Sequence, residues 1–246
     1  MIGLATGSAI LGALKSPAQP AGKTGTSKLT QNPWPYVELD PKKCAERAYK
    51  GFIKGHCMYG VFEGIVAEYA EKQGPEYANF PFDMLYVGAG GGNGWGTLCG
   101  ALNGAMLALA LFSKKYDPLV DELFNWYQVT PLPVFRPEKP RLEIPVKSVA
   151  KSTLCHMSVS RWCAAAKAKA FSDDRDERCG WLCGDVAMKT VELLNAQLAG
   201  TFKAAYPISA ATAECRTCHD KGSSNENERG KMECDLCHFV HGDKHP

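Results

Sequence analysis

Apolar residues recur at a helical spacing through most of the chain, and capping residues mark where the helices begin. Asp40 followed by Pro41 predicts a helix start, because Asp is a favoured N-cap and Pro fits the first turn. Residues 55–57 (Gly-His-Cys) predict a break in this helix. A second helix is predicted over residues 58–72, ended by a Gly-Pro pair at 74–75.

Four further helices are predicted, over residues 95–112, 118–128, 158–171 and 178–199. The first of these is apolar nearly all round, which indicates a buried central helix. Residues 130–145 contain five prolines and are predicted to be extended, because repeated Pro excludes a helix. No stretch alternates polar and apolar residues over the length of a strand. The sequence therefore predicts an all-α fold: a multi-helix body with a short, irregular C-terminal tail.

The first 32 residues differ from the rest of the chain. Residues 2–14 are an apolar run too short to span a bilayer, and residues 16–21 are similar to the small-residue end of a signal peptide. The usual basic segment is missing, so this start lies either inside a longer precursor, which we favour, or in an ordinary buried segment. Three parts are expected: a signal-like segment and linker (1–32), a helical cysteine-rich body (33–200) and the tail (201–246).

Composition adds one strong signal. The 28 basic and 26 acidic residues nearly cancel, so nothing indicates nucleic-acid binding. No apolar run is long enough for a membrane span. Eleven cysteines in 246 residues is a high content, and a redox or metal site would account for several of them.

Two copies of the sequence C-x-x-C-H lie in the tail, at residues 215–219 and 234–238. This is the attachment motif of c-type haem, in which two thiols add to the porphyrin vinyl groups and the adjacent His binds the iron. We therefore expect two covalent c-type haems. The attachment and proximal residues are Cys215, Cys218 and His219 in the first motif and Cys234, Cys237 and His238 in the second.

Zinc is the main alternative for these cysteines. Fifteen residues separate Cys218 from Cys234, so the two pairs also match a zinc-ribbon spacing. A four-cysteine zinc site needs no histidine, yet a histidine follows each pair at once, and four of the six histidines lie in the tail. The histidines therefore favour haem.

The distal haem ligands are less narrowly defined. The candidates are His241 and His245 in the tail, His56 and His156 in the body, and Met232. His241 lies three residues after His238 and cannot easily reach the opposite face of the same haem, but it can reach the other haem or a haem of a second subunit. The two body histidines are less favoured, because a capping or core role is more common. The methionine ranks below histidine because it lies only two residues before the second haem motif.

Seven cysteines remain, an odd number that cannot all pair within one chain: Cys44, Cys57, Cys99, Cys155, Cys163, Cys179 and Cys183. Cys179 and Cys183 are one helical turn apart, about 6 Å, which suits one metal centre. Cys155 and Cys163 would lie about 12 Å apart on a continuous helix. Both can bind one cluster only if Cys155 lies in a loop, which a helix cap at Ser158 or Ser160 would allow.

These four cysteines (Cys155, Cys163, Cys179 and Cys183) are the predicted iron–sulfur ligands, because iron–sulfur clusters are held by thiolates. The alternative is that they are small buried apolar residues, as free cysteines often are. Cys44 is expected to be structural.

Residues 55–57 and 99–104 (Cys-Gly-Ala-Leu-Asn-Gly) resemble the redox-active family named for a C-G-A-x-x-G motif and four cysteines. Cys155 and Cys179 resemble its third and fourth cysteines, and the resemblance makes Cys57 and Cys99 the alternative cluster ligands. The chain departs from that family by its additional cysteines and its two-haem tail. The combination resembles the split-Soret cytochromes c of sulfate-reducing bacteria, which implies a homodimer with two haems per subunit and an iron–sulfur centre, for which [2Fe–2S] is one candidate type.

We therefore expect a periplasmic electron-transfer protein, because haem is attached in this way outside the bacterial cytoplasm. Electrons would pass between the cluster and the haem pair and on to an unidentified redox partner. One alternative is a haem and iron–sulfur oxidoreductase that reduces a small molecule, which a five-coordinate haem binding carbon monoxide would favour. Another is a zinc-binding structural module, which a colourless protein would favour.

The two complete motifs predict an intact mass that exceeds the polypeptide mass by two haems. The double substitution Cys215→Ala/Cys218→Ala should remove one haem and leave the other. A mass equal to that of the bare chain plus zinc would contradict this prediction.

Overall fold

The computed structural model describes residues 33–238, so the signal-like segment and the tail end with His241 and His245 lie outside the described residues. The described chain is helical, with two isolated β-bridges and no strand, which confirms the all-α prediction. None of its helices is long and apolar enough to cross a membrane. Its helices are α1 (Pro41–Gln73), η2 (Pro75–Ala78), η3 (Phe82–Gly88), α2 (Gly100–Phe112), α3 (Asp117–Val129), α4 (Cys155–Ala166), α5 (Asp173–Leu198) and α6 (Ala210–His219).

Helix α1 consists of two halves that meet at a sharp kink. Asp40 caps the first turn by accepting hydrogen bonds from the backbone N–H groups of Lys42 and Lys43, as predicted. The helix breaks at Gly55 (φ −143°) and His56 (φ 64°), which confirms the predicted break. A positive φ is uncommon for His, so the kink is held by its surroundings.

The two halves of α1 pack against each other as a hairpin. A Cβ on Gly60 would lie 2.6 Å from the backbone N of Phe52, so only glycine permits this approach. Arg47 in the first half donates a hydrogen bond to Glu68 in the second, over 3.2 Å. The hairpin places Cys57, immediately after the kink, at its turn.

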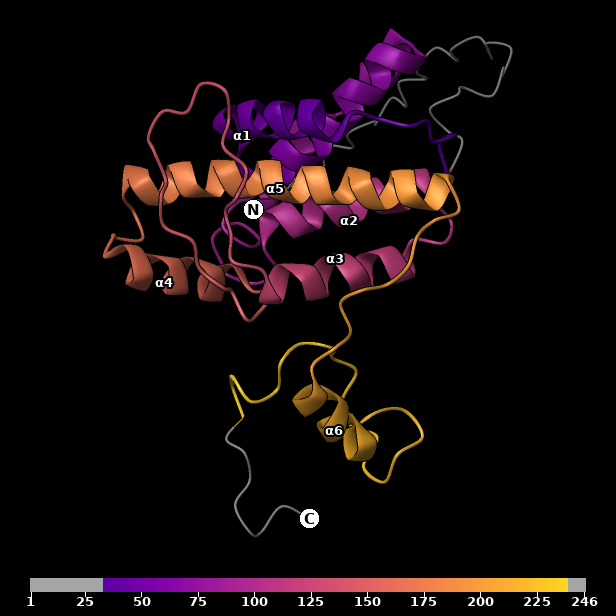
Figure 1. Cartoon of the computed structure of the whole chain (residues 1–246), viewed down its shortest axis with the longest axis vertical. Coiled ribbons are helices and arrows are strands. Elements are labelled where there is room, and N and C mark those ends of the chain that lie inside the picture. The colour runs from indigo at the N-terminus through magenta and orange to yellow at the C-terminus, as the bar shows by residue number, and fades with distance from the viewer. Residues whose placement is uncertain (1–32, 239–246) are drawn as a thin grey trace, which may run out of the picture.

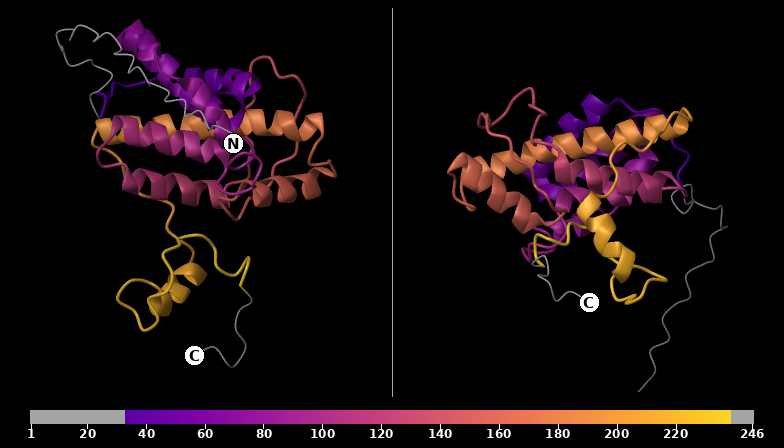
Figure 2. Two further views of the ribbon diagram at one scale, coloured as in Figure 1. Left: turned by 180° about the vertical axis from the view of Figure 1, so that it is seen from behind. Right: turned by 60° about the horizontal axis from the view of Figure 1, so that its bottom comes forward.

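Helix α5 runs through the middle of the body and packs against both α1 and α2 (Figure 1). Helix α2 is buried, as predicted, and its residues Ala101, Leu102 and Ala105 have no exposed surface. Helices α3 and α4 lie on the side of α5 that faces the tail (Figure 1). The tail with α6 projects from the body after α5, and the view from behind in Figure 2 shows the same arrangement.

The predicted start of α2 is wrong by five residues, because the helix begins at Gly100 rather than at residue 95. The preceding loop turns through five glycines with positive φ between residues 90 and 96, a conformation that favours Gly. Leu98 then forms a β-bridge with Leu154. Residues 90–98 therefore form a glycine-rich loop that precedes α2 and are not the first turns of the helix.

The predicted bounds of α4 are also wrong. The N-cap is Leu154, not Ser158 or Ser160, so Cys155 is the first residue of the helix rather than part of a loop. The helix ends where Lys167 adopts the left-handed conformation (φ 55°). Helix α6 was not predicted; Ser209 caps it, so the tail is more regular than its composition indicates.

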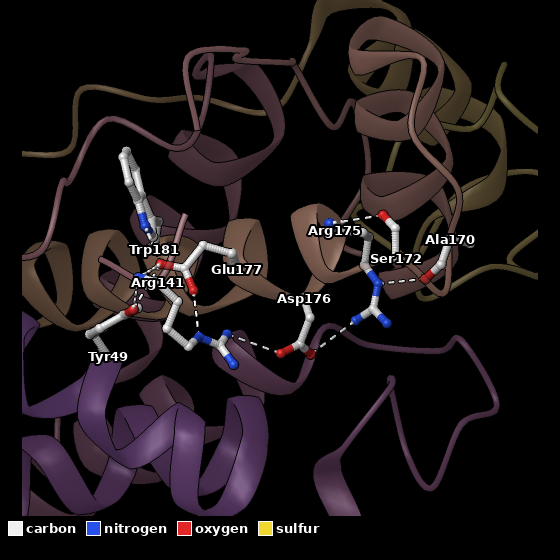
Figure 3. A network of polar contacts seen from close by, with 8 residues as sticks. All are labelled: Tyr49, Arg141, Ala170, Ser172, Arg175, Asp176, Glu177 and Trp181. Carbon is white, nitrogen blue, oxygen red and sulfur yellow. Dashed lines mark hydrogen bonds and ion pairs between the residues drawn. The ribbon is translucent and has the colours of Figure 1, made fainter. Parts of the chain in front are cut away.

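The proline-rich segment is extended, as predicted, and a buried carboxylate on α5 ties it to the body (Figure 3). Glu177 accepts hydrogen bonds from Tyr49 Oη (2.8 Å), Arg141 Nε (2.7 Å) and Trp181 Nε1 (2.9 Å). Arg141 also pairs with Asp176 on the exposed side, over 3.0 Å. Burial would raise the pKa of Glu177, but these hydrogen bonds outweigh it and hold the pKa below its usual value.

The first turn of α5 continues this network (Figure 3). Ser172 Oγ accepts a hydrogen bond from the backbone N–H of Arg175, whose Nε donates to the carbonyl of Ala170. Arg175 also lies 3.5 Å from Asp176. The start of α5 is thus capped and joined to the loop before it.

Replacing Glu177 by Gln should lower the free energy of unfolding by about 1–3 kcal/mol, because it weakens hydrogen bonds to a buried charge. Urea unfolding of the haem-loaded protein measures the loss. Glu143→Gln is the matched control: it breaks the exposed ion pair with Arg136, so little change is expected.

The difference between wild type and Glu177→Gln should depend on pH. The folded-state pKa of Glu177 is lowered, so its stabilisation is present above the unfolded value of about 4.3 and is lost as pH falls through the folded value. The two proteins should differ at neutral pH and converge in acid. A difference in unfolding free energy that does not shrink as the pH falls would show that the charge is not the cause.

Candidate functional site

The first haem motif lies on α6. Cys215 and Cys218 are on this helix, and His219 is its last residue. His219 Nδ1 lies 2.7 Å from Asn227 Oδ1. Such a contact fixes the orientation of the imidazole, as the hydrogen-bond partners of metal-binding histidines do. The geometry is compatible with iron ligation through Nε2.

The second haem motif folds back against the first. The backbone N–H of His238 donates to the carbonyl of Cys234 over 2.9 Å, which forms a tight turn. Burial and the nearby thiol of Cys215 raise the pKa of Cys234, so the two attachment sites are neighbours. Ser209 at the start of α6 donates to Glu233 over 2.7 Å and holds the motifs together.

The tail also contacts the body immediately before the second motif. Lys231 pairs with Asp121 on α3 over 2.8 Å. Thr153 Oγ1 donates a hydrogen bond to the sulfur of Met232 over 2.9 Å. The predicted role of Met232 as a lower-ranked haem ligand is untested, and in this structure its sulfur faces the body.

Five of the remaining cysteines converge where helix ends meet in the body. Each comes from a distinct local feature: Cys57 follows the kink of α1, Cys99 is the N-cap of α2, Cys155 opens α4, and Cys179 and Cys183 are one turn apart on α5. Electrostatic contacts link these five thiols to one another. We call this group the five-thiol cluster.

Backbone pairing fixes the start of α2 against the start of α4. The N–H of Cys99 donates to the carbonyl of Thr153 over 2.9 Å, and the N–H of Cys155 donates to the carbonyl of Thr97 over 2.6 Å. Glycine is needed beside them: a Cβ on Gly91 would lie 2.6 Å from the Cβ of Cys155. This pairing therefore depends on the glycine loop.

The other thiols reach the cluster by close helix packing. A Cβ on Gly100 would lie 2.9 Å from the Cβ of Cys57 and 2.4 Å from the carbonyl oxygen of Gly88. Cys183 Sγ lies 3.8 Å from the carbonyl oxygen of Cys57. Within residues 33–238, no three His, Cys, Asp or Glu side chains are positioned to bind one metal ion. Metal binding by this cluster therefore requires the thiol side chains to rotate toward one another.

Four of the cluster thiols, Cys57, Cys99, Cys155 and Cys183, are not activated nucleophiles. Burial raises the pKa of Cys99 to about 11 and also raises the pKa of Cys155 and Cys183. The pKa of Cys57 is raised mainly by its hydrogen bond with Cys183 and by burial. Thiols with raised pKa are unreactive as free groups, whereas a metal ion deprotonates them on binding.

Arg178 brings a positive charge to the cluster. It is 1% exposed, and its Nη2 donates to Ser158 Oγ over 3.0 Å, while Tyr127 Oη donates to the same oxygen over 2.8 Å. Arg178 Nε and Nη1 have no hydrogen-bond partner in the described chain. Burial would lower the pKa of Arg178, but nearby groups that carry negative charge when ionised, chiefly Cys179, Tyr127 and Cys99, raise it overall.

The structure brings together only part of the predicted ligand set. Cys155, Cys179 and Cys183 lie with the alternates Cys57 and Cys99. Cys163 is on the same helix as Cys155, about 12 Å further along, and packs against the apolar cluster around Trp162 and Trp181. Its thiol interacts electrostatically with Cys179, but with none of the other four cluster thiols. The helix begins at Cys155 and not after a cap at Ser158 or Ser160, so there is no loop that would let Cys155 approach Cys163.

The other singled-out residues lie apart from these roles. Cys44 is buried on α1, where burial and Glu68 raise its pKa. His56 is exposed at the kink, with its ring against Phe52. His156 is exposed, and its Nδ1 lies 3.1 Å from the carbonyl oxygen of Gly96. None of these contacts tests the distal-ligand prediction.

Sequence reasoning missed Arg178, Tyr127 and Ser158. The arginine directly precedes Cys179, but it is the last of six consecutive charged residues (173–178), a pattern that usually indicates a solvent-exposed helix face. The local sequence therefore does not mark it as buried. The tyrosine and serine come from other helices, and no local pattern joins them to the cysteines.

A pocket of about 350 Å³ lies away from the cluster. Its lining includes Tyr36, Phe112 and Leu194, at the far end of α5 from the cysteines. This pocket is therefore separate from the thiols.

Comparison with known proteins adds independent information. A family model described as "Putative redox-active protein (C_GCAxxG_C_C)" matches residues 56–193. The split-Soret cytochrome c of Desulfovibrio desulfuricans is 41% identical over 96% of this chain and 90% of its own length. A solved structure described as "A novel iron centre in the split-Soret cytochrome c from Desulfovibrio desulfuricans ATCC 27774" has a TM-score of 0.79 at 40% identity, covering 87% of this chain and 93% of that one.

The family pattern differs from this chain at its central motif. The pattern places Cys directly before Ala, as G-C-A-x-x-G. Here residues 99–104 are Cys-Gly-Ala-Leu-Asn-Gly, so the cysteine stands one position earlier and Gly100 takes its place. The C-G-A-x-x-G form therefore belongs to this sequence rather than to the family pattern. Since Cys99 is the N-cap of α2, the shift puts its thiol before the helix rather than in its first turn.

Proposed function

The chain belongs to the redox-active family with the pattern C_GCAxxG_C_C and is a homologue of split-Soret cytochrome c, a haem-containing electron carrier; from this premise we propose that it carries electrons between an iron–sulfur centre and two covalent c-type haems. The observation that carries the proposal is the contact between Thr153 and Met232. Thr153 binds the backbone of Cys99 and lies two residues before Cys155, while Met232 lies two residues before the second haem motif.

The donor set of the five-thiol cluster fits an iron–sulfur centre. Iron–sulfur centres are held by four thiolates, and this site offers five largely buried thiols. Beside them lies Arg178, two of whose nitrogens have no hydrogen-bond partner among the described residues. We propose that four of these five are the ligands, with Cys57 and Cys99 serving in place of Cys163. When bound, the centre supplies one-electron chemistry; the chain supplies its burial and its charge.

We place the protein in the periplasm, because c-type haem of this kind is attached outside the bacterial cytoplasm. The partner that receives the electrons is a further redox protein. Haem is the proposed occupant of the tail rather than zinc, because both motifs are complete to the histidine.

We further propose a homodimer in which the haem tails meet. The tail is short, and the motif cysteines Cys215 and Cys237 are exposed. Haem faces left in water are unfavourable by about 25 cal/mol per Å² of apolar surface. A second copy of the tail across a two-fold axis would cover them and would offer His241 or His245 as a distal ligand.

Iron should exceed haem in the purified protein. Cys57→Ala and Cys99→Ala should each lower the iron-to-haem ratio toward one without changing haem content, because each removes a proposed ligand. Total iron by mass spectrometry and haem by pyridine haemochrome give the ratio.

Two variants make this test specific. Cys44→Ala removes a buried thiol outside the cluster and should leave the ratio unchanged. Cys163→Ala separates the two ligand sets: loss of iron there, with iron retained in Cys99→Ala, would contradict the set proposed here. A wild-type ratio of one, with all seven thiols open to alkylation, would reject the centre itself.

Truncation after residue 239 should weaken the dimer and convert haem from six-coordinate low-spin to high-spin, because it removes His241 and His245. Analytical ultracentrifugation and the visible spectrum report these changes. A truncated protein that stays dimeric and low-spin would refute the shared ligand and favour His56 or His156.

A further inference from the structure

Arg178 is a buried cation for which the protein supplies incomplete compensation. Its side chain is 1% exposed, and its Nη2 donates a hydrogen bond to the neutral hydroxyl of Ser158. Its Nε and Nη1 have no hydrogen-bond partner within residues 33–238. A buried charge without a partner is costly, so this arrangement favours an anion beside the guanidinium.

The carboxylates near Arg178 are already engaged. Glu177 binds Tyr49, Arg141 and Trp181. Asp185 is on the same helix and feels the charge of Arg178, but its oxygens accept the backbone N–H groups of residues 134 and 135. Neither carboxylate forms an ion pair with Arg178 in the described chain.

The thiols are the remaining groups that can become anionic. Cys179 and Cys99 are the cysteines whose charge acts most strongly on Arg178. They come from α5 and from the start of α2, so thiols on two different elements are near the guanidinium. Thiolates bound to iron carry the negative charge that this cation lacks.

We infer that Arg178 is the buried counter-cation of the iron centre and raises its reduction potential, with Ser158 and Tyr127 fixing the guanidinium in place. The inference rests on the proposed iron–sulfur function of the five-thiol cluster. Reduction adds one negative charge to the centre. A fixed cation nearby stabilises the reduced form more than the oxidised form, and burial limits screening by water.

Substitution of Arg178 by Gln in the full haem-loaded protein tests this inference. The ratio of reduced to oxidised non-haem iron at a fixed potential should fall about tenfold, a shift of about 59 mV to more negative potential for one electron. Redox titration followed by electron paramagnetic resonance measures it, and the haem potentials should change less. Arg178→Lys should recover most of the shift, because it keeps the charge.

Arg161→Gln is the matched control. Arg161 is a half-buried arginine on α4 whose Nε also lacks a hydrogen-bond partner in the described chain, and its loss should leave the potential unchanged. Non-haem iron retained in Arg178→Gln at the wild-type potential would overturn the inference.

If Arg178→Gln loses its non-haem iron, the iron content of Arg178→Lys distinguishes two explanations. Iron retained in Arg178→Lys would support the need for charge, whereas equal loss from both variants would overturn the inference in favour of a packing role. Wild-type protein without non-haem iron would instead refute the proposed iron–sulfur function.

Discussion

Two consecutive residues of α5, Glu177 and Arg178, carry opposite charges in the interior, and the architecture depends on how each charge is compensated. Glu177 is compensated by the protein itself, through donors from α1, the proline-rich segment and its own helix. Arg178 interacts electrostatically with Cys179 and Cys99 and donates to the neutral hydroxyl of Ser158, while its Nε and Nη1 have no hydrogen-bond partner among residues 33–238. Glu177 joins three segments of the body, and Arg178 indicates a position where a bound anion would be stabilised.

The sequence predicted the features that are local in the chain. The cap at Asp40, the break at residues 55–57 and the extended proline-rich segment each follow from a few neighbouring residues, and all three were confirmed. The haem motifs are equally local, since five consecutive residues define each one. The start of α4 was predicted wrongly, because the bridge between Leu98 and Leu154 determines it from 56 residues away.

The ligand set shows the same limit. Cys163 could join Cys155 only through a predicted helix cap at Ser158 or Ser160, whereas packing between helices brings Cys57 and Cys99 near the other thiols. Gly100 permits that packing, because a larger residue would collide with Gly88 and Cys57. No periodicity in the sequence encodes such an approach. The resemblance to a cysteine-rich family named this pair as alternates, because a family motif can retain contacts that spacing cannot reveal.

The central claim is that iron occupies the five-thiol cluster and that the haem tail is joined to it. Anomalous diffraction from crystals of the haem-loaded protein, measured on both sides of the iron absorption edge, tests it most directly. The account predicts two iron peaks per chain in the tail and further iron enclosed by Cys57, Cys99, Cys155 and α5. Iron confined to the two tail positions, or a body peak beside Cys163 instead, would contradict it.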